Sequence, residues 1–277
     1  MPLMKSRNYM AFIVEGESRE PQIINNLQSV HFKHSNFKVI TLPAGQNIYM
    51  LWQRMNEDDF ETDIIEILRE NSEELKETLE GLDRDDFSQI FLFFDYDGHQ
   101  DNLPSGNRTE DVLEKMLANF DNETENGKLY INYPMVEALR DFEPGVCGKK
   151  SDCYCQINQF ADYKQLSADR RIYNDLRKYD FEIWRELLNV FAMRVSCLFN
   201  VENVISHDTY CDKVNPYTVY NCQKNYILHG KVFILSGFPE FLLDYFPAKF
   251  WNACIKCVRK PVGDCQKDSM KLEISPS

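Results

Sequence analysis

The stretch IFLFFDYDG, residues 90–98, carries the strongest strand signal in the chain. Five consecutive apolar residues, three of them phenylalanine, are typical of a strand that is buried on both faces of a parallel sheet. The Asp-Tyr-Asp-Gly that follows ends this strand, because aspartate and glycine favour turns. The stretch therefore predicts a central parallel strand with two acids, Asp95 and Asp97, at its carboxyl end.

Further strand-like and helical segments alternate around this strand. A helix is expected soon after Gly16, where Ser18 is a suitable N-cap and Pro21 suits the first turn. The predicted strands are YMAFIV at 9–14, FKVITL at 37–42 and LYINY at 129–133, and the predicted helices lie at about 18–27, 48–55, 109–120 and from 134 onward. This alternation predicts an α/β fold with a parallel sheet flanked by helices.

The second half of the chain has a different pattern. A loop containing cysteines is expected at 144–158, and the regions that follow are mainly helical. The predicted helices lie at about 181–199, 216–228, 238–246 and 248–258. We therefore expect two units, an α/β domain over 1–145 and a mainly helical C-terminal extension over 146–277.

Composition limits the class of protein. The 277 residues are 43% hydrophobic and 13% aromatic, which is enough for a buried core and excludes wholesale disorder. No apolar run approaches the roughly 18 residues that a membrane helix needs. The first nine residues lack the apolar region of a secretory signal. We expect a cytoplasmic protein with reduced cysteines and no membrane contact.

Charge is strongly negative and unevenly spread. The net charge is −13, with 13 basic and 29 acidic residues over 1–143 and 18 basic and 15 acidic residues after that. An acidic chain is a poor passive binder of nucleic acid, so such binding needs metal ions, a basic face or a basic partner. The segment 57–86 holds 14 acids and three bases. It is either a solvated helix face or a docking surface for a basic partner.

Acidic residues follow several of the predicted strands. Glu15 comes directly after the first strand, Asp95 and Asp97 after the central one, and Glu137 shortly after the fourth. The carboxyl ends of parallel strands share one edge of a sheet, where ligand sites form. Carboxylates that cluster there repel one another unless a cation is bound, and hard oxygen ligands select Mg²⁺ or Mn²⁺.

The spacing of the aspartate pair supports this interpretation. In extended backbone, Asp95 and Asp97 point to the same side, and Tyr96 points away. Both aspartates are thereby able to reach one metal ion.

Three motifs together resemble a Toprim domain, the Rossmann-like metal site of topoisomerases, primases and OLD-family nucleases. They are VEGE at 14–17, FDYDG at 94–98 and YPMVE at 133–137. The resemblance covers about residues 8–145. It is strongest to the small Toprim proteins of bacterial anti-phage systems, of the RloB, AbiL and PARIS kinds, which are paired with an ABC/AAA-type ATPase.

The resemblance implies a role for each matching residue. Glu15 matches the first Toprim glutamate, a metal ligand or general base, and Asp95 and Asp97 match the metal-binding pair. Glu137 matches a later catalytic acid. Glu20 lies where similar proteins repeat an acid and is a further candidate metal ligand. The chain lacks the tyrosine-nucleophile domain of topoisomerases.

Other candidates come from the second half. Lys164 is the best candidate for a lysine that stabilises charge developing on a scissile phosphate. Arg170-Arg171 and Arg177-Lys178 form the densest basic stretch, either a phosphate contact or a solvated helix face. The cysteines at 147, 153 and 155, and at 254, 257 and 265, are either free thiols or zinc ligands. No Walker motif is present.

The residues and the resemblance together predict a metal-dependent endonuclease that requires Mg²⁺ or Mn²⁺. Its expected substrate is DNA or RNA, including tRNA, and its expected role is the toxic effector of abortive infection, restrained by the ATPase partner. A homodimer is left open. The alternatives are a non-catalytic interaction subunit with a degenerate Toprim fold and a primase-like nucleotidyl transferase.

Overall fold

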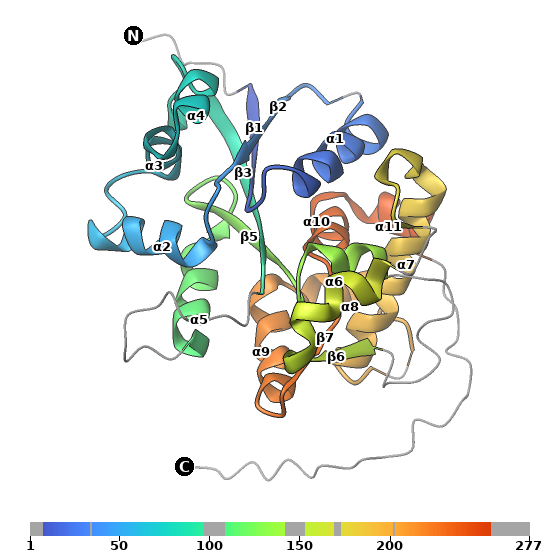
Figure 1. Cartoon of the computed structure of the whole chain (residues 1–277). Helices are drawn as coiled ribbons and strands as arrows, with labels where there is room; N and C mark the ends of the chain where they lie inside the picture. The colour runs from blue at the N-terminus through green and yellow to red at the C-terminus, as the bar shows by residue number, and fades with distance from the viewer. Residues whose placement is uncertain are drawn as a thin grey trace.

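The computed structural model describes residues 8–33, 35–96, 109–141, 153–168, 173–201 and 203–255. Within them, the centre is a five-stranded sheet in the order β2-β1-β3-β5-β4 (Figure 1). Four strands run parallel, and the short edge strand β4 pairs antiparallel with β5. The strands are β1 (Tyr9–Val14), β2 (Lys38–Pro43), β3 (Phe87–Asp95), β4 (Asp121–Asn122) and β5 (Gly127–Asn132).

The predicted α/β class with a mostly parallel sheet is therefore confirmed. The central strand is the longest in the sheet, and the residues from Ile90 to Phe94 are buried because layers of helices cover both faces. The β4–β5 hairpin was not predicted. Its turn ends at Gly127, where a positive φ of 110° is combined with close contact to β3: a Cβ at this position would lie 2.5 Å from a methyl group of Leu92.

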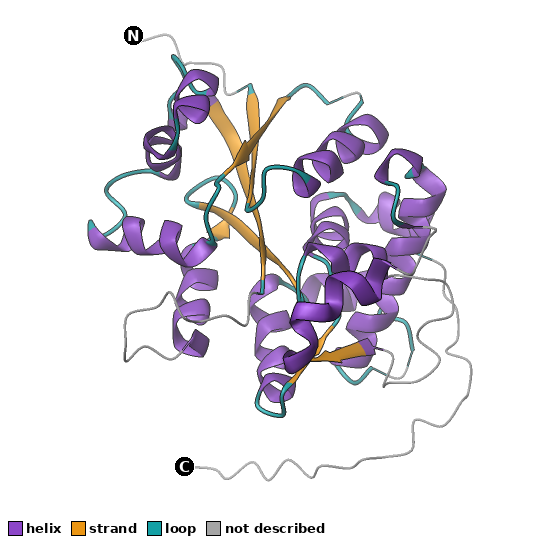
Figure 2. Ribbon diagram, in the orientation of Figure 1, coloured by secondary structure: helices purple, strands orange, loops and turns teal. Residues whose placement is uncertain are grey.

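Helices from the first half lie on both sides of the sheet (Figure 2). Helix α1 packs on one side, and α2 to α5 lie on the other. Their bounds are α1 (Arg19–His31), α2 (Ile48–Glu57), α3 (Ile64–Asn71), α4 (Glu73–Thr78), the 3-10 turn η1 (Arg84–Asp86) and α5 (Thr109–Asn119). The helix expected after Pro134 is instead a 3-10 helix, η2 (Val136–Asp141).

The second half is mainly helical, as predicted, and adds a small sheet. Strands β6 (Tyr154–Gln156) and β7 (Lys231–Phe233) pair antiparallel. The part of the expected cysteine loop that the structure describes therefore contains β6. The helices are α6 (Phe160–Ala168), α7 (Phe181–Leu198), α8 (His207–Lys213), α9 (Pro216–Ile227), α10 (Gly237–Tyr245) and α11 (Ala248–Cys254), with the 3-10 turns η5 (Ile157–Gln159) and η7 (Leu176–Lys178).

Helix α10 covers the central sheet from the second half of the chain. Phe241 is fully buried, and its ring centroid lies 4.8 Å from that of Phe91 in β3 and 5.4 Å from that of Phe12 in β1. At the start of α10, a Cβ on Gly237 would lie 2.8 Å from the Cβ of Tyr130 in β5. The two halves of the chain thus share one continuous apolar core.

An aromatic group surrounds the end of α1. The ring of His31 lies about 6 Å from four other rings, those of Phe181, Trp184, Phe246 and Phe250. Burial among them lowers the pKa of His31 from 6.5 to about 4. Among the described residues, no helix is both long enough and apolar enough to cross a membrane.

The pKa of His31 predicts an acid-sensitive contribution to stability. The folded state keeps this ring neutral, whereas the unfolded chain protonates it below about pH 6.5. The free energy of unfolding is therefore highest, as far as His31 is concerned, above about pH 6.5, and it falls as the pH drops toward 4. We expect His31→Leu to gain stability relative to the wild type between pH 6.5 and 4, measured by urea unfolding at several pH values. A difference that stays constant with pH would contradict the assignment.

Truncating Phe241 tests the packing of α10 on the sheet. Phe241→Ala leaves a cavity against β1 and β3, so we expect the free energy of unfolding to fall by about 3–5 kcal/mol. Leu228→Ala is the control, because Leu228 is 76% exposed and its truncation should change stability by less than about 0.5 kcal/mol. Similar losses for the two variants in urea unfolding would refute the described packing.

Candidate functional site

The strand order reverses the direction of winding at the carboxyl ends of β1 and β3. The chain passes from β1 to β2 on one side and then to β3 on the other, so the direction of winding reverses between β1 and β3. Open α/β sheets bind ligands at such a reversal. Glu15 follows β1 and Asp95 ends β3, and the Asp95 backbone N–H donates a hydrogen bond to Glu15 Oε2 over 3.1 Å.

Glu20 joins these two acids from the first turn of α1. Its side chain is buried and lies over Gly16, where an added Cβ would come within 2.8 Å of Glu20 Oε2. The Gly16 and Glu20 backbone amides hydrogen-bond the carboxylate. Burial raises the pKa of Glu20 despite these bonds, and the charge of Glu137 adds to the rise. Because residue 16 is a glycine, the Glu20 carboxylate has room to lie next to Glu15.

The pKa of Asp95 is strongly raised. Loss of solvent raises its pKa well above the usual 3.8, and the negative charges of Glu15 and Glu20 raise it further. A backbone hydrogen bond from Val136 and a side-chain hydrogen bond from Asn132 act in the opposite direction. The three acids therefore lie close enough to repel one another in a poorly solvated place, an arrangement that favours a bound cation.

Asn132, the last residue of β5, orients Asp95. It is fully buried, and its Nδ2 donates to Asp95 Oδ1 over 3.1 Å. Its Oδ1 accepts from Ser236 Oγ at 3.1 Å and from the Gly237 N–H at 3.0 Å, at the start of α10. One amide thus joins the acid of β3 to the C-terminal half. Sequence reasoning missed Asn132, although its position as a polar residue at a strand end was a usable signal.

Glu137 and Lys164 complete the rim of the group. Glu137 in η2 is buried, and its Oε1 lies 3.7 Å from Lys164 Nζ on α6. The Lys164 side chain is 76% exposed, so its ammonium group is in contact with solvent as well as with Glu137. The Lys164 ammonium group thus lies beside Glu137 at the solvent-exposed border of the group of acids.

Buried polar contacts fix η2 against α6 and α7. Arg140 donates to Ser167 Oγ over 2.8 Å and also to the Lys164 carbonyl. The Tyr163 hydroxyl donates to Asp141 Oδ2 over 2.8 Å. Arg194, fully buried in α7, donates to the carbonyl of Asp141 at 3.0 Å. These bonds hold the segment that carries Glu137 next to the helix that carries Lys164.

The structure therefore brings together five of the predicted site residues, namely Glu15, Glu20, Asp95, Glu137 and Lys164. Asp97 lies outside the described residues. Within the described ranges, no three His, Cys, Asp or Glu side chains are already spaced as a metal site. The acids form an electrostatic cluster rather than a preformed coordination shell.

The other candidates from the second half have varied outcomes. Arg177 and Lys178 both pair with Asp175, whose carboxylate caps η7, so they have a local structural use. Arg170 and Arg171 lie outside the described residues, as do the cysteines at 147, 257 and 265. Cys153 and Cys254 are buried free thiols, and burial raises the pKa of Cys155 to about 12.

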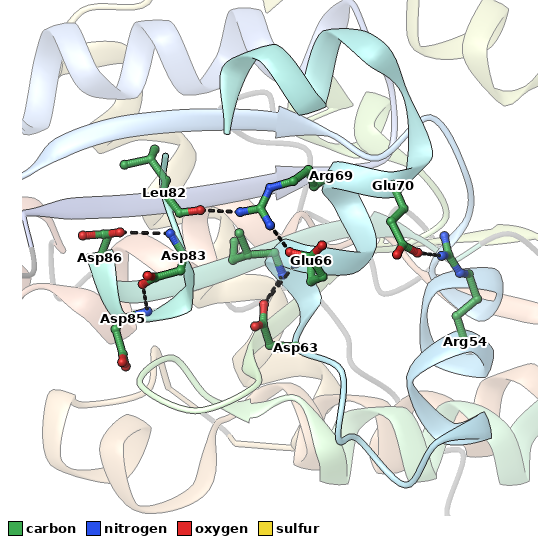
Figure 3. A network of polar contacts seen from close by, with 10 residues as sticks. Arg54, Asp63, Glu66, Arg69, Glu70, Leu82, Asp83, Asp85 and Asp86 are labelled. Atoms are coloured by element: carbon green, nitrogen blue, oxygen red, sulfur yellow. Dashed lines mark hydrogen bonds and ion pairs between the residues drawn. The ribbon is translucent and has the colours of Figure 1, made fainter. Parts of the chain in front are cut away.

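The acidic segment 57–86 uses many of its charges internally (Figure 3). Asp63 caps α3 by accepting from the Ile65 and Glu66 amides. Arg69 joins Glu66 to the Leu82 carbonyl. Arg54 pairs with Glu70 at 2.8 Å. Part of the acidic excess of this segment therefore has a structural use, because these acids cap helices or pair with nearby arginines.

The end of this segment lies away from the carboxylate cluster. Asp83 and Asp86 form a reciprocal capping box around η1, directly before β3 begins. Asp95 ends the same strand, so the two groups of acids lie at opposite edges of the sheet. The segment is thus not part of the candidate site.

Comparison of the chain with protein-family models, curated proteins and solved structures finds no match.

The raised pKa of Asp95 predicts that replacing this residue by a neutral one increases the free energy of unfolding, by an amount that depends on pH. Its raised pKa means that the folded state disfavours the charged form, so wild-type stability is lost as the pH rises above about 4. We expect Asp95→Asn to be more stable than the wild type in EDTA, by a margin that grows from pH 4 to pH 8. Glu77→Gln, which removes an exposed acid on α4, is the control. An Asp95→Asn protein with no pH-dependent advantage in urea unfolding would contradict the burial and repulsion described for Asp95.

Proposed function

We propose that the chain is a divalent-cation-dependent nuclease. The observation that carries the proposal is the meeting of Glu15 and Asp95 at the winding reversal of the sheet, with Glu20 beside them. The atoms that these residues offer to a metal ion are all carboxylate oxygens, which Mg²⁺ and Mn²⁺ prefer. The negative charges also repel one another where little water screens them, and a bound cation relieves that repulsion. The Toprim resemblance of the three motifs supports the same interpretation.

Each residue then has a role that its position allows. Glu15, Asp95 and Glu20 would hold the cation, with Asp97 as the ligand that the resemblance adds. When bound, such a cation polarises a phosphodiester and lowers the pKa of water. Asn132 keeps the Asp95 carboxylate in one orientation. Glu15 takes a proton from the attacking water, and Lys164 stabilises the charge that develops on the phosphate.

Cleavage of nucleic acid by the purified protein tests the proposal. Plasmid DNA and total tRNA are incubated with Mg²⁺, Mn²⁺ or EDTA, and we expect cleavage only with a metal. Glu15→Gln should abolish it, and Lys164→Met should lower kcat by about a hundredfold. The control is Glu17→Gln, an exposed acid two residues further along, which should keep full activity.

Two outcomes would contradict the nuclease proposal. Cleavage that survives Glu15→Gln would belong to another site or to a contaminant. A folded protein that cleaves neither substrate with either metal would favour the alternative, a non-catalytic interaction subunit. Activity that requires nucleotides would indicate a nucleotidyl transferase.

The proposed partner is an ABC/AAA-type ATPase, and the proposed role is anti-phage defence. The support for both is the sequence resemblance, together with exposed acids on the 57–86 segment such as Glu73, whose side chain is 86% exposed. Docking through this segment would be weakened by salt. A pull-down across a salt series should recover the ATPase at low salt, and recovery of the chain alone would contradict the partner.

A further inference from the structure

A histidine and a cysteine face each other on the short helix α8, outside the carboxylate cluster. Residues four apart lie on the same face of a helix. His207 Nε2 is 3.5 Å from Cys211 Sγ, and Cys211 is exposed. The two side chains are thus within hydrogen-bond distance of each other, and the His207 side chain is 26% exposed.

The separation of the two atoms matches one edge of a zinc tetrahedron. With a Zn–S distance of about 2.3 Å, a Zn–N distance of about 2.05 Å and a tetrahedral angle, the sulfur and nitrogen lie about 3.5 Å apart. Imidazole and thiolate ligands select Zn²⁺ over Mg²⁺ or Ca²⁺. The spacing of the two atoms therefore suits one shared ion of this kind.

The surroundings of His207 also suit a metal ligand. Its other ring nitrogen, Nδ1, lies 3.4 Å from Asp208 Oδ1. Metal-binding histidines characteristically donate this second N–H to a carboxylate, which fixes the tautomer with Nε2 free for the metal. Trp251 packs edge-on against the ring at a centroid distance of 5.7 Å and restricts its rotation.

The charges near Cys211 favour a cation over a nucleophilic role for the thiol. A Cys–His–Asp set is also found in thiol enzymes, where the pKa of the cysteine is lowered. Here the carboxylates of Asp244 and Asp208 lie near Cys211. Their negative charge opposes a bare thiolate and favours a cation beside the sulfur.

We propose that His207 Nε2 and Cys211 Sγ bind Zn²⁺ or a similar borderline-soft divalent cation. Binding displaces the thiol proton to solvent, so that a thiolate ligates the ion. Among the described residues no third His, Cys, Asp or Glu completes the set. The site is therefore open, with its remaining positions taken by water or by an added ligand, and it is separate from the oxygen-ligand site proposed at the sheet edge.

Cobalt titration of the full-length, EDTA-treated protein tests this site. Co²⁺ replaces Zn²⁺ and gives a thiolate-to-cobalt charge-transfer absorption in the near ultraviolet, which added Zn²⁺ should remove. We expect Cys211→Ser to bind one equivalent fewer than the wild type with loss of the corresponding absorption. His207→Gln should bind this equivalent at least about tenfold more weakly. Cys222→Ser, a partly buried cysteine on α9, is the matched control and should titrate like the wild type.

The outcome that overturns the proposal is unchanged stoichiometry and absorption in Cys211→Ser. Retained tight binding in His207→Gln would also overturn it, because the ion would then be held by sulfur without the imidazole. Far-ultraviolet circular dichroism on each variant establishes that α8 and its neighbours remain folded. Cobalt binding is measured without any cleavage assay. Its result therefore tests the site on α8 separately from the proposed nuclease function.

Discussion

The central constraint on this molecule is that a parallel sheet must be covered on both faces. Strands β1, β3 and β5 are apolar on both sides, and their side chains are removed from water by α1 and α10 on one face and by α2 to α5 on the other. Polar groups are consequently concentrated at the strand ends. Glu15, Asp95 and Asn132 all lie at the carboxyl ends of these strands, so the same burial that stabilises the sheet concentrates charge at one edge.

The C-terminal half takes part in this site as well as in the core. Asn132 is bonded both to Asp95 and to the first residues of α10, while Arg194 on α7 and Arg140 on η2 fix the segment that carries Glu137. Helix α10 therefore both covers the sheet and supports its charged edge. A change in the packing of α10 would be transmitted to Asp95 through a single buried amide.

The four parallel strands of the central sheet and most helices were predictable because their signals are local. Runs such as IFLFF at 90–94 and the strand-end acids Glu15 and Asp95 stand out without knowledge of the rest of the chain. The contacts of Phe241 with β1 and β3 were not predictable, because they join residues far apart in sequence. The pairing of His207 with Cys211 was not predicted either, because no helix was expected at 207–213. The N-cap Ser206, which accepts from the Thr209 amide, was the available signal.

The most direct test of the proposed cation site is a titration of the protein with Mn²⁺. Electron paramagnetic resonance measures the unbound ion, and so gives the amount bound by the cluster of Glu15, Glu20 and Asp95. The Cys211→Ser protein serves as the background, so that the site on α8 does not contribute. The account predicts one bound Mn²⁺ that is lost on adding Asp95→Asn and kept on adding Glu17→Gln. Equal binding by the Asp95→Asn protein, or no binding by the parent, would contradict the claim that these acids form a cation site.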